Sequence, residues 1–167
     1  MPMALDVQPE LETSRPYLDE LPKEALRRTI RDWLESPEPL GEADALFDVP
    51  AIVRRCLGRH WPLQSPAERA SFADVLAGRL ADTLRETLGA ASRIRYTAQS
   101  ASGPLVTVRA EVARDGGAPA ALELRVHRAR GRWLLNDFVV DGKSFVAEHR
   151  ARLEHALAGP AEARLSS

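Results

Sequence analysis

The sequence predicts an α+β fold, in which a strongly curved four-stranded antiparallel sheet carries helices on its concave side around an apolar cavity. Two patterns predict this class. Four runs between residues 94 and 140 alternate apolar and polar residues, which is typical of an antiparallel sheet with one face in water. A helix beginning near residue 65 carries one long apolar stripe, which needs a broad apolar surface to pack against.

Length and composition limit the function classes. The 167 residues carry a formal charge of −1, so the clear basic excess of most nucleic-acid binders is absent. Cys56 is the single cysteine, which rules out an intrachain disulfide, and no apolar run approaches the ~18 residues of a membrane span. We expect one domain over residues 15–158, a loosely held segment at 1–14 and a C-terminal tail at 159–167.

The N-terminal third predicts two helical segments. Helical spacing begins near Tyr17, is interrupted at Pro22 and resumes to Leu34. Asp48 is a good N-cap for a second, short helix that has a proline in its first turn, and Gly58 is expected to end it.

A long helix follows. Ser65 and Glu68 form a capping box with proline at the first helical position, and Gly89 is expected to end the helix. The predicted apolar stripe consists of Phe72, Val75, Leu76, Leu80, Leu84 and Leu88.

The first three predicted strands place small and medium apolar side chains on one face. Turns are expected at 115–117 and 130–131. The inward positions are Ile94, Tyr96 and Ala98, then Val106, Val108, Ala110 and Val112, then Leu122, Leu124 and Val126. An ordinary solid core is the simplest interpretation of these positions, but aromatic residues are few and a deeply curved sheet is hard to fill with such side chains. Together with the family resemblance described below, this favours a lipid-filled cavity.

The fourth strand changes its pattern midway. Trp133 and Leu135 share one parity, whereas Phe138 and Val140 share the other, which predicts a bulge or sharp bend across 136–137. Gly142 is expected to end the strand. Ser144 can then cap a helix that presents Val146, His149, Leu153 and Leu157 on one face.

Two blocks of sequence resemble a known family. The first is the run from Gly131 through Trp133, Leu135, Asp137-Phe138, Val140 and Gly142 to Ser144-Phe145-Val146. The second is Leu57-Gly58-Arg59-His60-Trp61 followed by 65–69 and Phe72. Together they span about residues 45–157 and resemble the MlaC-like family, the periplasmic phospholipid-binding shuttles of Gram-negative bacteria that are also known as toluene-tolerance proteins.

The resemblance implies a soluble periplasmic carrier that holds the acyl chains of a phospholipid and maintains outer-membrane lipid asymmetry. It implies no enzymatic activity and no cofactor, and its partners would be an inner-membrane ABC transporter with a substrate-binding ring and an outer-membrane lipoprotein complex. The carrier is expected to be a monomer without stable membrane insertion. The location rests on the resemblance alone, because residues 1–10 contain no signal-peptide apolar segment.

The expected lipid contacts come from the long helix, the inward strand positions and the start of the last helix. They are Phe72, Val75, Leu76, Leu80, Leu84, Ile94, Tyr96, Val106, Val108, Leu122, Leu124, Val126, Phe138, Val140 and Phe145.

Asp137 admits two interpretations. A carboxylate in an apolar strand is either a catalytic acid or a structural acceptor for backbone N–H groups at the bulge. The family has an aspartate here and is not enzymatic, so we expect a structural role, shared with Trp133 and Gly142, with His149 as a candidate partner. Cys56 and His60 stand four residues apart, but no third ligand lies near them, so no metal site is predicted.

Two arginine clusters remain. Arg54, Arg55, Arg128 and Arg130 are candidates for docking an acidic partner surface or lipid phosphates, while a merely solvated face is the alternative. Three other functions stay open: a carrier of a hopanoid or another apolar ligand, a small hydrolase or isomerase in a cone-shaped α+β fold, and an interaction module with a solid core.

Overall fold

The computed structural model describes residues 21–36 and 43–165, with side chains up to 157. Tyr17, Leu18 and the segment 1–14 therefore lie outside the described residues. The helices are α2 (Pro22–Glu35), α3 (Ala43–Leu46), α4 (Val49–Leu57), α5 (Pro66–Leu88) and α6 (Phe145–Leu165), with 3-10 turns η2 (Gly58–Leu63) and η3 (Ala91–Arg93). The strands are β1 (Ile94–Ser102), β2 (Leu105–Val112), β3 (Ala120–Ala129), β4 (Arg132–Val140) and β5 (Lys143–Ser144).

The strands form one antiparallel meander in the order β1-β2-β3-β4-β5. The α+β class is confirmed, but the sheet has five strands instead of the predicted four. The additional strand has only two residues, which pair with Val139 and Val140 after a tight turn. In that turn Asp141 and Gly142 both have positive φ (50° and 84°), a conformation that returns the chain at once.

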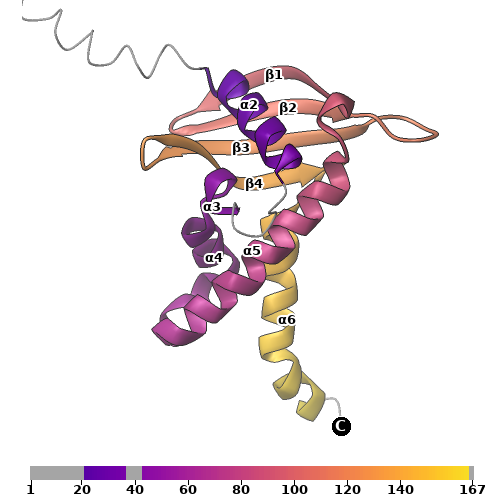
Figure 1. Cartoon of the computed structure of the whole chain (residues 1–167). Helices are drawn as coiled ribbons and strands as arrows, with labels where there is room; N and C mark the ends of the chain where they lie inside the picture. Colours follow the sequence, from indigo (N-terminus) through magenta and orange to yellow (C-terminus); the bar gives the residue numbers. More distant parts are fainter. Residues whose placement is uncertain (1–20, 37–42, 166–167) are drawn as a thin grey trace, which may run out of the picture.

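The helices pack on one face of the sheet. Figure 1 shows α2 lying across the strands, whereas α5 and α6 run away from the sheet so that their far ends project beyond it. The opposite face is wet: Arg109 lies 3.7 Å from Glu123, and Arg95 pairs with Glu111. Ion pairs on one face and apolar side chains on the other are the expected result of strict alternation.

Local signals set the helix ends as predicted. Ser65 and Glu68 make both bonds of the capping box at the start of α5. The carboxylate of Asp48 accepts the Ala51 N–H (3.3 Å) at the start of α4, and the Ser144 hydroxyl accepts the Ala147 N–H (3.1 Å) at the start of α6. α6 continues to Leu165, beyond the expected domain end at 158.

The predicted bulge in β4 is confirmed. Asp137 pairs with Arg125 and Leu135 pairs with Val126, so Asn136 is the extra residue. Beside it, Phe47 forms an isolated parallel bridge with Leu135, and the Asp48 N–H donates to the Leu135 carbonyl (2.8 Å). The bulge thus bends β4 where the chain before α4 lies along its edge.

β1 departs from the predicted pattern. A second register shift falls between Tyr96 and Ala98, and the Thr97 hydroxyl donates to the Arg109 carbonyl across it. Past this bulge every residue of β1 is exposed, Ala98 included. The prediction that Ala98 faces inward is therefore wrong, because an extra residue moves the following side chains to the other face.

Candidate functional site

Most of the predicted lipid-contact residues belong to one buried cluster, to which the sheet and the helices α2, α3, α4, α5 and α6 all contribute. Leu80 and Leu84 from α5 and Leu124 from β3 are each 0% exposed. The other buried members are Leu76, Val106, Val108, Leu122, Val126, Phe138 and Phe145. In this structure these side chains form part of one continuous core with residues of α2 and α4.

The side chains that α5 contributes to the buried core are all apolar. Among the residues that the structure describes, no hydrogen bond or ion pair joins α5 to a strand. Its polar contacts run elsewhere: Arg85 donates to the Trp33 carbonyl of α2 (2.9 Å), and Arg69 donates twice to the Trp61 carbonyl of η2. When one apolar surface replaces another in such an interface, the free energy of burial changes little, because apolar burial has no preferred direction.

Three predicted contacts lie at the margin of this cluster. Ile94 and Tyr96 in β1 and Val140 in β4 are half-buried and pack against the core. The Arg27 guanidinium lies 5.7 Å from the centre of the Tyr96 ring, and burial raises the pKa of the Tyr96 hydroxyl to about 12. Tyr96 is therefore a neutral phenol at physiological pH.

Val75 lies apart from the buried members of the predicted stripe. It is 57% exposed and outside the buried cluster, although it belongs to the predicted stripe. With Phe72, Leu76 and Arg79 it forms one wall of a groove of about 250 Å³ between α5 and α6. The opposite wall consists of His149, Arg152, Leu153 and Ala156, and we call this feature the α5–α6 groove.

The groove combines an apolar floor with positive charge. Phe72 and Leu153 are half-buried and Leu76 is buried, while Arg79 and Arg152 are exposed at its rim. His149 stacks on Phe145 (3.9 Å between ring centres), and its Nδ1–H donates to the Phe145 carbonyl (3.0 Å). Burial, with smaller contributions from Arg152 and Arg79, lowers the pKa of His149 below 6.5.

Asp137 links β4 to α6. Its side chain is 0% exposed and accepts the N–H groups of Phe138 (2.8 Å) and Val146 (3.1 Å) and the hydroxyl of Ser144, while an Arg125 nitrogen lies 3.4 Å away. The carboxylate thus holds the first turn of the helix that follows the bulge. The predicted contact between Asp137 and His149 is wrong, because the His149 Nδ1–H donates to the Phe145 carbonyl of its own helix.

The other two predicted structural residues occupy ordinary positions. Trp133 packs against the core, with the Arg128 guanidinium 5.4 Å from its ring centre. Gly142 has φ of 84°, which glycine adopts without strain, so it lets the chain turn from β4 into β5.

Two of the predicted docking arginines meet in a second, polar pocket of about 310 Å³. Arg55 and Arg128 line it together with Arg125, His127 and Asn136. Arg55 donates to the Asn136 carbonyl (2.9 Å). Arg54 lies elsewhere, 5.8 Å from the Trp61 ring centre, and Arg130 occupies the β3–β4 turn with φ of 51°.

His127 and Asp48 form a contact that the sequence analysis missed. The His127 Nε2–H donates to the Asp48 carboxylate (2.7 Å), and the Asn136 amide donates to His127 Nδ1 (3.3 Å). These three residues come from separate elements, so no local spacing marks them. The chain Asp48–His127–Asn136 has the form of a catalytic relay, but no serine, threonine or cysteine lines its pocket among the described residues.

Cys56 is no substitute nucleophile. It is 0% exposed, and burial raises the pKa of its thiol to about 11, with the Asp137 carboxylate adding to the effect. Thiols that react as nucleophiles are exposed and have a lowered pKa. No group of three metal-ligating side chains occurs in the part of the chain that the structure covers.

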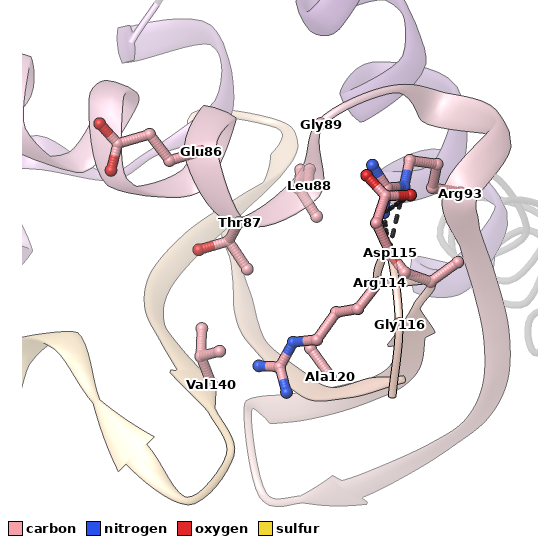
Figure 2. Close-up of a pocket in the computed structure, with 11 residues that line it drawn as sticks. Glu86, Thr87, Leu88, Gly89, Arg93, Arg114, Asp115, Gly116, Ala120 and Val140 are labelled. Atoms are coloured by element: carbon pink, nitrogen blue, oxygen red, sulfur yellow. Dashed lines mark hydrogen bonds and ion pairs between the residues drawn. The ribbon is translucent and has the colours of Figure 1, made fainter. Parts of the chain in front are cut away.

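A third pocket, of about 470 Å³, lies at the end of α5 and is drawn in Figure 2. Arg93 lies 3.5 Å from Asp115, and Arg114 pairs with Asp141. Hydrogen bonds to the Ala121 N–H and to Arg114 hold the pKa of Asp141 below its ordinary value. Since these charges already pair with one another, this pocket has less to offer an anionic or an apolar ligand than the α5–α6 groove.

None of the described helices is long and apolar enough to cross a bilayer.

One comparison with known proteins bears on the family and another on the fold. The model of the MlaC protein family matches residues 41–159. Among solved structures, a phospholipid-binding protein from Ralstonia solanacearum, in complex with a phospholipid, superposes with a TM-score of 0.61. The match covers 84% of this chain and 85% of that chain at 18% identity. No curated protein matches.

Proposed function

The chain belongs to the MlaC family, and on that basis we propose that it binds a phospholipid and carries it between membrane complexes in the periplasm. The acyl chains lie between α5 and the sheet, and the headgroup faces water. The protein acts by binding and release and not by catalysis.

The observation that carries this proposal is the character of the α5–sheet interface. Leu80 and Leu84 belong to the same buried apolar cluster as the inward side chains of β2 and β3, and no polar link joins α5 to a strand in the described residues. Methylene groups of a lipid can replace such contacts with little change in free energy, because apolar burial has no preferred direction. A movement of α5 away from the sheet would open the space that two acyl chains need.

The energy of lipid burial determines how release must happen. Two acyl chains bury about 30 methylenes at ~0.8 kcal/mol each, which is on the order of 20 kcal/mol. Even after the cost of ordering the lipid, release into water would be too slow for a carrier. Handover therefore takes place in contact with a partner that offers an adjoining apolar surface.

The partners we propose are an inner-membrane ABC transporter with its substrate-binding ring and an outer-membrane lipoprotein complex. Arg55 and Arg128 converge on one pocket and Arg130 lies in the adjacent turn, so this end of the sheet is the candidate docking surface. Charge of one sign on a docking surface speeds association and makes it sensitive to salt.

The test is the lipid content of the purified protein. Organic extraction followed by mass spectrometry should yield about one phospholipid per chain, and the delipidated protein should take phospholipid from vesicles. A parent protein that carries no lipid and takes up none would refute the proposal. Recovery of a polycyclic lipid alone would identify a hopanoid carrier instead.

A further inference from the structure

We propose that the α5–α6 groove binds the phosphate of the lipid headgroup, with Arg79 and Arg152 as its ligands and the groove floor as the entrance for the acyl chains. This inference rests on the proposed function and locates the headgroup within it. The ligand class is a glycerophospholipid, bound as a single molecule.

The first argument is charge. Arg79 on α5 and Arg152 on α6 face one groove, and neither has a hydrogen bond or ion pair within the described part of the chain. Most other arginines nearby are engaged: Arg59 and Arg150, for example, each lie 4.0 Å from Glu154. Two guanidinium groups without a carboxylate repel each other, and a phosphate between them removes that repulsion while accepting charge-assisted hydrogen bonds.

The second argument is the matching pattern of the two walls. Phe72, Leu76 and Arg79 stand at helical spacing on α5, and His149, Arg152 and Leu153 do so on α6. Each wall therefore presents apolar side chains beside one arginine. That combination suits an amphiphile in which an anionic headgroup and apolar chains are attached to the same small group.

The third argument is the position of Leu76. Its side chain lines the groove, yet it is 1% exposed and belongs to the buried core cluster that also contains the inward side chains of the sheet. The groove and the proposed acyl-chain space thus share one side chain as their boundary. At about 250 Å³ the groove is smaller than most ligand sites, so it suits the headgroup end of a lipid and not a whole lipid.

A single headgroup explains these features better than a membrane surface does. Recognition of anionic bilayers relies on clusters of about 4–8 basic residues. Here the two arginines converge on a concave site instead of spreading over a face.

The experiment compares two lipids with identical acyl chains, phosphatidylglycerol and diacylglycerol, the second of which lacks the phosphate. Delipidated protein is incubated with vesicles containing one or the other, and bound lipid per protein is measured. The variants are Arg79→Gln with Arg152→Gln and, as a control with equal charge loss, Arg31→Gln with Arg95→Gln, which lie on α2 and on the wet face of the sheet.

The groove variant should bind phosphatidylglycerol about tenfold to a hundredfold more weakly, as expected for the loss of one to two charge-assisted hydrogen bonds. Its diacylglycerol uptake should equal that of the parent, and the control should match the parent for both lipids.

Three results would overturn the headgroup site while leaving the carrier function intact: unchanged phosphatidylglycerol uptake by the groove variant, an equal loss for both lipids, or reduced vesicle co-sedimentation without any change in bound lipid. Binding of inorganic phosphate by the parent as tightly as phosphatidylglycerol would also overturn it. A parent that takes up neither lipid refutes the proposed function itself.

Discussion

The two helices that form the groove are attached to the sheet in different ways. α5 meets the strands only through apolar side chains, as far as the described residues show, whereas α6 is tied to β4 through the buried carboxylate of Asp137. Apolar contacts tolerate sliding and exchange, but a buried carboxylate with three donors does not. The comparison teaches that α6 has a directional attachment to the sheet, whereas the polar contacts of α5 go to α2 and η2 instead.

The largest effect is expected from breaking the α6 attachment. Asp137→Ala leaves the N–H groups of Phe138 and Val146 without their acceptor in a buried site, so the free energy of unfolding should fall by about 3 kcal/mol. Urea denaturation measures this free energy of unfolding. Asp82→Asn, an exposed carboxylate on α5, is the control and should change stability by less than ~0.5 kcal/mol. A loss below ~1 kcal/mol for Asp137→Ala would show that α6 is held by packing instead.

The second prediction enlarges one side chain on each helix. Val146→Trp on α6 should lower stability by about 1–3 kcal/mol, because an overpacked site next to Asp137 cannot relax. Leu80→Trp on α5 should lower the stability of the delipidated protein by less than ~1 kcal/mol, because the helix can shift, while bound lipid falls sharply. Thermal denaturation and lipid-to-protein ratios provide the comparison. Equal destabilisation by both substitutions would mean that the α5 interface is a solid core.

The third prediction concerns His149, which belongs to α6 and lines the α5–α6 groove opposite Arg79. Its folded pKa is lowered by burial and then by Arg152 and Arg79, with Glu148 opposing, so the folded state binds fewer protons than the unfolded state. The folded state is therefore more stable above pH 6.5 than below it, and the free energy of unfolding falls as the pH drops below 6.5. Arg79→Gln with Arg152→Gln should raise the His149 pKa, as should bound phospholipid. Titration of the imidazole protons by NMR checks both, and Lys23→Gln on α2 should leave the pKa unchanged.

The smallest effect is expected at Cys56, on the α4 helix that contacts both α5 and α6. Because the thiol is buried and its pKa is about 11, alkylation of the lipid-free protein in buffer should be much slower than that of the unfolded chain. If α5 moves to admit lipid, contact with phospholipid vesicles should increase the rate modestly. Identical rates with and without vesicles would count against a moving α5.

Sequence reasoning identified the features that depend on local chemistry, namely the helix caps and the bulge. The caps at Ser65 and Asp48 each depend on a donor three residues away, and the parity change around Asn136 reveals the bulge directly. These features need no knowledge of the rest of the fold. The family resemblance added the expected ligand.

The groove could not be predicted in this way, and Val75 shows why. α5 runs away from the sheet, as Figure 1 shows, so only part of its unbroken apolar stripe can face the strands. Residues in its N-terminal half line a groove with α6 instead. Likewise, the contact of His127 with Asp48 joins residues 79 apart, which no short spacing predicts.

The Phe47 bridge to Leu135 affects the tendency of the protein to aggregate when it opens to admit a lipid. An exposed strand edge invites pairing with other chains, which leads to aggregation. Here β5 pairs with one end of β4, and the bridge together with the Asp48 N–H occupies the middle of the same edge. At the opposite edge, β1 carries a bulge and a polar, exposed second half. A movement of α5 would therefore expose apolar side chains, but it would not expose an unpaired strand edge with which a neighbouring molecule could form a cross-β contact.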